Sequence, residues 1–155
     1  TYGGDCIGLA AAEACIPKLE RERGAEHLWN IGTTLKDGFN QLARNHNLQE
    51  FVKCIGYPCR TIISFDGKGI YNELEMKSIF QQELIRRGIL WTAYHAISWA
   101  HSKKDIKLTL NAFDESMSVF KKIISGRSSL RSFIEGKPVE PVFRKVSDFN
   151  SYTTK

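Results

Sequence analysis

The sequence FVKCIGYPCRTIISF, Phe51 to Phe65, contains two short apolar runs with a turn between them. The first run extends from Phe51 to Gly56 and the second from Thr61 to Phe65, and Tyr57-Pro58 supplies turn residues between them. Asp66-Gly67-Lys68-Gly69 ends the second run. The pattern predicts an antiparallel pair of strands.

Helices are predicted on both sides of this strand pair, where apolar residues recur at spacings of three and four. The expected helices cover residues 5–22, 25–45, 72–87 and 102–126. Asp5 is the expected N-cap of the first, and Pro17 is expected to break or kink it. Ser102, followed by Asp105, predicts a near relative of the capping box at the start of the last helix. Ile89-Leu90-Trp91 is expected to form a short buried strand.

The order helix, helix, hairpin, helix, strand, helix predicts an α+β fold, with helices packed on one face of an antiparallel sheet. The long N-terminal helix pair is a poor fit to a self-contained core of this size. We therefore expect residues 1–45 to be connector helices from another domain, residues 46–126 to form a small domain, and residues 127–155 to be a C-terminal tail.

Composition narrows the class of protein. The chain has 155 residues, a net charge of +5 and 42% hydrophobic residues, which is ordinary globular composition and excludes a disordered or rod-like protein. No apolar run approaches the length of a membrane helix, and the first residues lack the features of a signal peptide.

We expect a cytoplasmic protein. Because the sequence does not begin with Met, we also expect a chain that is either processed or a piece of a longer one. Basic residues are scattered among acidic ones and no nucleic-acid motif occurs, so neither nucleic acid nor a membrane is an expected partner.

Few residues point to chemistry by themselves. Cys6, Cys15, Cys54 and Cys59 lack zinc or redox spacing and are expected to be buried structural thiols. His95 and His101 have no third ligand at a suitable spacing, so no metal site is expected. The segment Thr1-Tyr2-Gly3-Gly4-Asp5 precedes a helix N-terminus, which favours an anion such as a phosphate; the alternative is an ordinary capped loop.

Two stretches carry a resemblance to a known family. Residues 1–12 read TYGGDCIGLAAA, which resembles the segment Thr-Phe-(Ser/Gly)-Gly-Asn-Pro-Leu-Ala-x-Ala-Ala of class III pyridoxal-phosphate-dependent aminotransferases. Residues 87–106, RGILWTAYHAISWAHSKKDI, resemble the C-terminal segment of the glutamate-1-semialdehyde 2,1-aminomutase branch, where a Ser-x-Ala-His-Thr-x-x-Asp-Ile turn leads into the last helix. The elements between them also match in order and spacing, so that the resemblance covers roughly residues 1–125.

The resemblance implies the small C-terminal domain of a fold-type-I enzyme, with the connector helices leading out of a large domain. The parent protein would bind pyridoxal 5′-phosphate, act on a small-molecule amino donor and acceptor through an external aldimine, and form a homodimer. The fragment itself would be inactive, with no catalytic residue in this chain, because the Schiff-base lysine would lie upstream of Thr1. Lys53 is expected to be an ordinary outward-facing strand lysine.

The family's site residues carry over to only a few positions. Thr1 matches the threonine that binds the cofactor phosphate across the dimer interface, although Asp5 and Cys6 stand where the family has Asn and Pro. Tyr94, His95 and Ser98 fall in the stretch that approaches the active site, where they would either face the substrate or simply pack. The chain lacks the arginine before a Pro-Pro-Leu-type turn that grips the α-carboxylate in many members, which favours the aminomutase-like branch.

Two other functions stay open. The chain could be a non-catalytic α+β interaction module derived from the same fold, and the segment preceding Thr1 would distinguish this from an enzyme. A basic nucleic-acid binder would instead require a strongly salt-dependent affinity.

Overall fold

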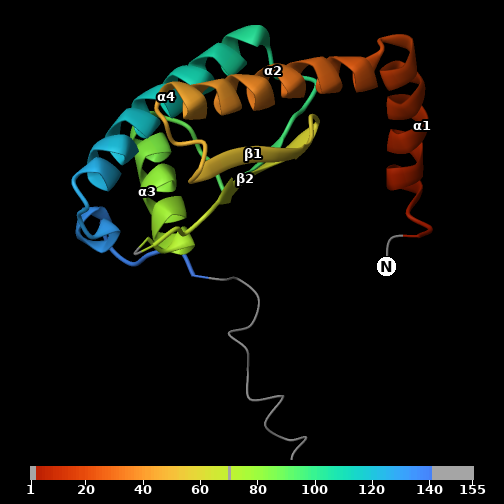
Figure 1. Cartoon of the computed structure of the whole chain (residues 1–155). Helices are drawn as coiled ribbons and strands as arrows, with labels where there is room; N and C mark the ends of the chain where they lie inside the picture. The colour runs from red at the N-terminus through yellow and green to blue at the C-terminus, as the bar shows by residue number, and fades with distance from the viewer. Residues whose placement is uncertain (1–2, 70, 141–155) are drawn as a thin grey trace, which may run out of the picture.

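The computed structural model describes residues 3–69 and 71–140, which form four α-helices, three strands and a short 3-10 helix (Figure 1). The elements follow in the order α1 (Cys6–Arg21), α2 (Gly24–Asn45), β1 (Val52–Tyr57), β2 (Arg60–Phe65), α3 (Glu73–Arg86), β3 (Tyr94–Ala96), α4 (Lys103–Ser125) and η1 (Leu130–Phe133). The four predicted helices are confirmed to within a residue or two at their ends. None of these helices combines the length and the apolar composition that crossing a membrane requires.

The three strands form one antiparallel sheet in the order β1-β2-β3. Val52 lies opposite Phe65 and Tyr57 lies opposite Arg60, so that Pro58 and Cys59 alone form the turn of the predicted hairpin. β3 pairs with the other edge of β2, where Tyr94 lies opposite Ile62. The predicted strand pair is therefore confirmed and extended by a third strand.

The third strand is not where the sequence predicts it. Ile89-Leu90-Trp91 forms no strand, and the paired residues are Tyr94–Ala96. Trp91 is buried, as expected, yet the chain reaches β2 only at Ala93, whose carbonyl accepts a hydrogen bond from Ile63 N–H at 3.0 Å. The apolar run thus identified a packed segment, but not the residues that join the sheet.

The core lies between one face of the sheet and helices α2, α3 and α4. Residues alternate along the strands, so that Val52, Cys54, Thr61 and Ile63 are buried while their neighbours are exposed. α2 and α4 lie side by side across this face (Figure 1). Aromatic rings join the two helices, since Phe39 of α2 meets Phe113 of α4 edge-on at 4.9 Å between ring centroids. The predicted α+β class, with helices on one face of the sheet, is confirmed.

α2 is fixed closely against the hairpin. A Cβ atom on Gly32 would lie 1.8 Å from the Pro58 carbonyl oxygen, so that only glycine permits this approach. Lys36 Nζ donates to the Gly56 carbonyl at 2.7 Å. Asn40 exchanges two hydrogen bonds of 2.9 Å with the backbone of Cys54. These contacts set the position of the strand pair relative to the helical layer.

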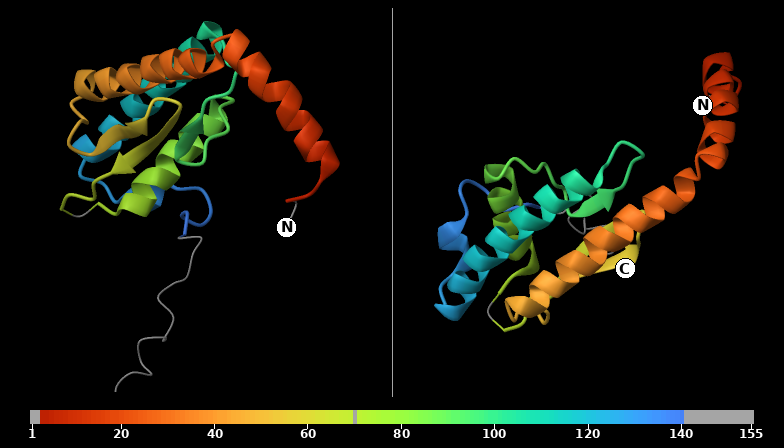
Figure 2. Two further views of the ribbon diagram at one scale, coloured as in Figure 1. Left: turned by 90° about the vertical axis from the view of Figure 1, so that its right-hand side faces the viewer. Right: turned by 90° about the horizontal axis from the view of Figure 1, so that it is seen from above.

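α1 stands apart from this core. It contains no buried residue, and it projects from the N-terminal end of α2 (Figure 2). Pro17 lies inside the helix without ending it, so that, of the expected break or kink, the break does not occur. The assignment of residues 1–45 to connector helices stays a prediction, and of its two helices α2 contributes Ile31, Leu35, Phe39 and Ala43 to the core.

The segment after α4 packs on α3. Leu130 is buried, and Gln82 of α3 donates to the Phe133 carbonyl and accepts from Glu135 N–H, at 3.0 and 2.8 Å. Val139 N–H donates to Ser78 Oγ at 2.8 Å. The first part of the predicted tail is therefore attached to the domain, and residues 141–155 lie outside the described residues.

Candidate functional site

β3 and the turn that follows it bring Tyr94 and His95 to one small cavity. The cavity has a volume of about 180 Å³ and lies between β3, α2 and α4. Its lining includes Leu35, Trp91, Tyr94, His95, His101 and Ile106. Ser98 joins this group through a hydrogen bond to His101. Tyr94, His95 and Ser98 therefore lie in one short segment, but Ser98 is outside the cavity lining, and the Tyr94 and His95 side chains lie on opposite sides of β3.

His95 points into the core side of β3. Its Nδ1 lies 2.8 Å from Oγ1 of Thr61, which is fully buried on β2. Its ring also stands perpendicular to that of Phe113, with 5.7 Å between centroids. Burial lowers the pKa of His95 to about 4, so that the imidazole is neutral at physiological pH.

Two buried nitrogen atoms beside this strand have no hydrogen-bond partner among the described residues. They are His95 Nε2 and Trp91 Nε1. Protonation of His95 would add a buried positive charge and a buried Nε2–H group without a hydrogen-bond partner. The surroundings of His95 compensate neither of them. The position therefore suits a neutral histidine.

Tyr94 lies on the opposite side of β3 and is about half exposed. The Arg60 guanidinium lies over the Tyr94 ring, 5.4 Å from its centroid. This distance is within the range of a cation–π interaction. The Tyr94 side chain therefore lies beside a positive charge that the sequence analysis did not single out.

Hydrogen bonds between Ser98 and His101 stabilise the turn that leads into α4. His101 Nδ1 accepts the Ser98 backbone N–H at 2.9 Å and lies 2.9 Å from Ser98 Oγ, while His101 N–H donates to the Ser98 carbonyl at 3.1 Å. His27 Nε2 donates to the His101 carbonyl at 3.2 Å. Because the Ser98 N–H must donate, His101 Nδ1 carries no proton in this arrangement. The Ser98 hydroxyl is exposed and held in place.

The next residues complete the start of α4. Ser102 Oγ accepts from Asp105 N–H at 3.3 Å, and the Asp105 carboxylate accepts from Ser102 N–H at 2.8 Å. The hydrogen bonds from Ser102 lower the pKa of the Asp105 carboxyl. The structure thus has a full capping box, with Asp in place of the usual Glu or Gln.

Ala93, immediately before Tyr94, has an unusual backbone conformation. Its φ of 85° lies on the left-handed side of the Ramachandran plot, which residues other than glycine rarely occupy. Such strain persists only where the surrounding structure holds it, and it occurs often at functional sites. The strand begins directly after Ala93, and Tyr94 and His95 lie on opposite sides of β3 because successive side chains alternate along a strand.

The expected phosphate contact lies partly outside the structure. Thr1 is not among the described residues. Asp5 caps α1 as predicted, accepting from Ile7 N–H and Gly8 N–H at 3.3 and 3.0 Å. These two amide groups are therefore already used by a carboxylate, and a phosphate would have to bind to the residues that precede them.

The cysteines differ from the expectation. Cys54 is buried and Cys59 is partly buried, but Cys6 and Cys15 are exposed on α1, and all four are free. Burial raises the pKa of the Cys54 thiol. The prediction of buried thiols is therefore wrong for α1, because this helix has no covering layer in the structure.

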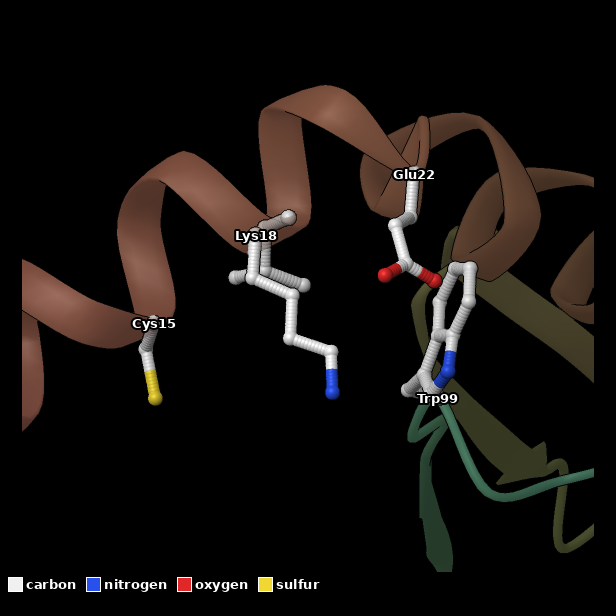
Figure 3. A pocket seen from close by; sticks show the side chains of 5 residues that line it. Cys15, Lys18, Glu22 and Trp99 are labelled. Carbon is white, nitrogen blue, oxygen red and sulfur yellow. The ribbon is translucent and has the colours of Figure 1, made fainter.

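A groove of about 210 Å³ separates α1 from the turn that carries Trp99 (Figure 3). Cys15, Lys18, Leu19 and Glu22 line it from α1. The Glu22 carboxylate extends toward the Trp99 ring. Within residues 3–69 and 71–140, no group of three or more His, Cys, Asp or Glu side chains is placed to hold a metal ion.

Sequence reasoning did not identify two residues of the site. Thr61 reads as an ordinary strand residue, and only the pairing of β2 with β3 shows that it contacts His95. Arg60 follows the hairpin turn, and only the third strand brings it to Tyr94. The contact of His101 had a local signal, because Ser98 and His101 are three residues apart, a spacing at which a side chain can accept a hydrogen bond from the backbone of a turn.

Comparison with solved structures finds the same fold in parts of longer proteins, although no family model matches the chain. One is the PLP internal aldimine form of the FumI protein of Sphingopyxis sp. MTA144, with a TM-score of 0.55 and 22% identity over 64% of this chain. Another is an omega-transaminase from Sphaerobacter thermophilus, with a TM-score of 0.53 and 16% identity over 60% of this chain. The matched region is 23% of each of those proteins, so that the chain shares its fold with less than a quarter of each of two much longer proteins.

Proposed function

We propose that this chain is the small-domain portion of a larger pyridoxal-phosphate-dependent class III enzyme, of the glutamate-1-semialdehyde aminomutase-like branch. The observation that carries the proposal is the fold shared with part of a protein solved as its PLP internal aldimine and with part of an omega-transaminase. The sequence supports it independently, since residues 1–12 and 87–106 resemble family segments at the expected separation.

The parent enzyme would move an amino group between small molecules. When bound, pyridoxal 5′-phosphate supplies the electron sink for such chemistry. The homodimer and the cytoplasmic location expected from the sequence belong to the same proposal.

Neither the cavity beside β3 nor the start of α1 suits the cofactor itself. No lysine lines the cavity beside Tyr94 and His95, and Asp5 already occupies two amide groups at the start of α1. The proposal therefore assigns the cofactor to a domain outside this chain, with Thr1 as a contact to its phosphate from the neighbouring subunit.

The chain's own contribution is a wall of the substrate pocket. Tyr94 and Ser98 present exposed polar groups, and both are held in place, by Arg60 and by His101. In this proposal they contact the substrate. In this proposal His95 does not contact the substrate. It acts at the same site by attaching β3 to β2 through its hydrogen bond with Thr61.

The first test is an absorbance spectrum of the protein encoded by the full reading frame, before and after borohydride. We expect a cofactor band that borohydride bleaches into a stable lysine-linked adduct. A colourless protein that takes up no added pyridoxal phosphate would contradict the proposal and leave the non-catalytic module as the function of this fold.

A second test asks whether this chain contributes to the substrate pocket. Ser98→Ala in the full-length enzyme should lower kcat/KM by roughly tenfold without altering the cofactor band. Ser125→Ala, at the exposed end of α4, is the matched control and should have no effect. Equal activity of both variants would remove Ser98 from the site.

A further inference from the structure

A groove of about 490 Å³ lies between α2 and α4, and its volume is within the range of small-molecule sites. Its floor is apolar, because Ile31 and Ile106 are buried beneath it and Leu110 is half-buried. Of its described lining residues, Ile106 alone also lines the cavity beside β3. The groove, which we call the α2–α4 groove, is therefore a separate feature of the domain.

The packing of the two helices closes the groove at one end. α2 and α4 lie side by side (Figure 1), and a Cβ atom on Gly38 would lie 2.7 Å from Leu110 Cδ1. The helices leave no space at this contact. The residues of α2 that line the groove, from Asn30 to Thr34, all precede Gly38, so that the groove extends from the contact toward the start of both helices.

Two lysines give the groove a positive charge. Lys103 and Lys107 line it from α4, are one helical turn apart and are exposed. Within residues 3–69 and 71–140, neither ammonium group has an ion pair or a hydrogen bond. Both lysines are therefore available to a ligand.

No acidic residue of the described chain lines the groove. Asp105, between the two lysines in the sequence, is engaged by Ser102 in the capping box. Asp114, further along α4, pairs with His46 at 2.6 Å. Asp37, the next acid of α2 after Thr34, is not part of the lining. The charge of the lysines is therefore not balanced within the groove.

Two side-chain amides add uncharged hydrogen-bond donors. Asn30 and Asn111 line the groove, and their amide groups have no partner among the described residues. The Thr34 hydroxyl is already used, since its Oγ1 donates to the Asn30 carbonyl at 3.0 Å. An apolar floor with ammonium and amide donors beside it is complementary to an apolar molecule that carries a carboxylate.

We propose that the α2–α4 groove binds a small amphipathic carboxylate. The apolar chain or ring of the ligand lies on Ile31, Ile106 and Leu110, and its carboxylate accepts hydrogen bonds from Lys103 and Lys107. This inference goes beyond the proposed function and does not depend on it, because it uses neither the cofactor nor the residues beside β3.

Equilibrium dialysis of the full-length protein against radiolabelled octanoate tests the proposal. We expect saturable binding of one octanoate per chain. Radiolabelled 1-octanol has the same chain length without the charge, and we expect it to bind at least roughly tenfold more weakly, because it forms no charge-assisted hydrogen bond with the lysines. Absence of saturable octanoate binding, or equal affinity for the two compounds, would overturn the proposal.

Paired substitutions then locate the charge. Lys103→Gln/Lys107→Gln should raise the Kd for octanoate at least roughly tenfold and leave the Kd for 1-octanol unchanged. Lys104→Gln/Lys122→Gln is the matched control, because it removes the same charge from exposed positions of α4 outside the groove. It should leave both constants unchanged, and equal effects of the two double variants would show that only the net charge of the protein matters.

Filling the groove tests its position directly. Asn111 is exposed and has no side-chain partner among the described residues, so that Asn111→Trp fills the groove without removing a lysine. We expect it to abolish binding of both compounds with an unchanged midpoint of urea unfolding. Binding that survives in Asn111→Trp would place the octanoate elsewhere, and one octanoate per two chains would indicate a site between two copies. Either result would overturn the inference, whereas the cofactor band, measured separately, decides the proposed function.

Discussion

Thr61 and His95 join two neighbouring strands through their side chains, with 2.8 Å between Thr61 Oγ1 and His95 Nδ1. Thr61 is fully buried, and burial lowers the pKa of His95 to about 4. β3 has three residues and lies at the edge of the sheet. The attachment of this short strand therefore depends on a neutral imidazole.

We expect this histidine to make the fold less stable in acid. The pKa of His95 is about 4 in the folded protein and 6.5 in its ordinary state, so the unfolded chain binds a proton over this interval that the folded chain does not. Stability is therefore fully present above pH 6.5 and falls as the pH decreases from 6.5 to 4, by about 3 kcal/mol in total. Urea unfolding at a series of pH values measures this slope.

The control for this titration is a variant that lacks the imidazole. His95→Gln should unfold at lower urea concentration near pH 7, and its stability should vary less between pH 6.5 and 4. His46→Gln removes the half-buried histidine that pairs with Asp114, and it should retain the His95 slope. An unchanged slope in His95→Gln would show that another group causes it.

Thr61→Val tests the hydrogen bond without changing the volume of the side chain. The variant leaves His95 Nδ1 buried without its partner, and we expect a loss of about 1–3 kcal/mol in the free energy of unfolding. Thr61→Ser keeps the hydroxyl and should lose less of the stability that depends on this bond. Equal losses in the two variants would show that the methyl group of Thr61, and not its hydroxyl, stabilises the strand.

The helices and the hairpin could be predicted because their signals are local. Asp5 and Ser102 cap the helices that they were expected to cap, and the turn at Pro58 and Cys59 sets the register of β1 and β2. Such side-chain caps and tight turns act within a few residues of the chain. Their outcome therefore depends little on the rest of the fold.

The third strand and the contacts of the site could not be predicted in this way. Tyr94–Ala96 is a strand because β2 lies beside it, and the apolar run at Ile89–Trp91 is a better local pattern that finds no partner strand. The resemblance placed Tyr94, His95 and Ser98 in one region, but Thr61 and Arg60 reach them only through sheet pairing. Exposure of Cys6 and Cys15 likewise depends on what covers α1.

Glu83 is the most buried acidic residue of the described chain, and two arginines compensate it. It lies 2.6 Å from Arg86 and 2.7 Å from Arg87, and Arg87 also pairs with the exposed Glu115 at 2.9 Å. Burial acts to raise the pKa of Glu83, but hydrogen bonds and charge from the two arginines outweigh it and hold that pKa below its usual 4.5. The ionised carboxylate therefore stabilises the fold above pH 4.5, and this contribution is lost as the pH falls through the lowered pKa.

We expect Glu83→Gln to lower the free energy of unfolding by about 2 kcal/mol at pH 7, because it leaves the arginines without their buried partner. Glu115→Gln removes only an exposed partner and should change it by less than about 0.5 kcal/mol. The difference between Glu83→Gln and the natural sequence should decrease below pH 4.5. A difference that is the same at pH 7 and pH 3 would show that shape, and not charge, explains the loss.

Gly32 controls how closely α2 approaches the hairpin turn. In Gly32→Ala the new methyl group would meet the Pro58 carbonyl oxygen at 1.8 Å, and both atoms belong to backbone-anchored groups that cannot rotate away. The hairpin must therefore move from α2, which would weaken the hydrogen bond from Lys36 to the Gly56 carbonyl as well. We expect a loss of about 2–3 kcal/mol in the free energy of unfolding, measured by urea unfolding.

Thr34→Ala, an exposed change on the same helix, should alter the free energy of unfolding by less than about 0.5 kcal/mol. If Gly32→Ala unfolded at the same urea concentration as Thr34→Ala, the hairpin would not be held against α2 at this distance, and the position of Arg60 would not depend on it.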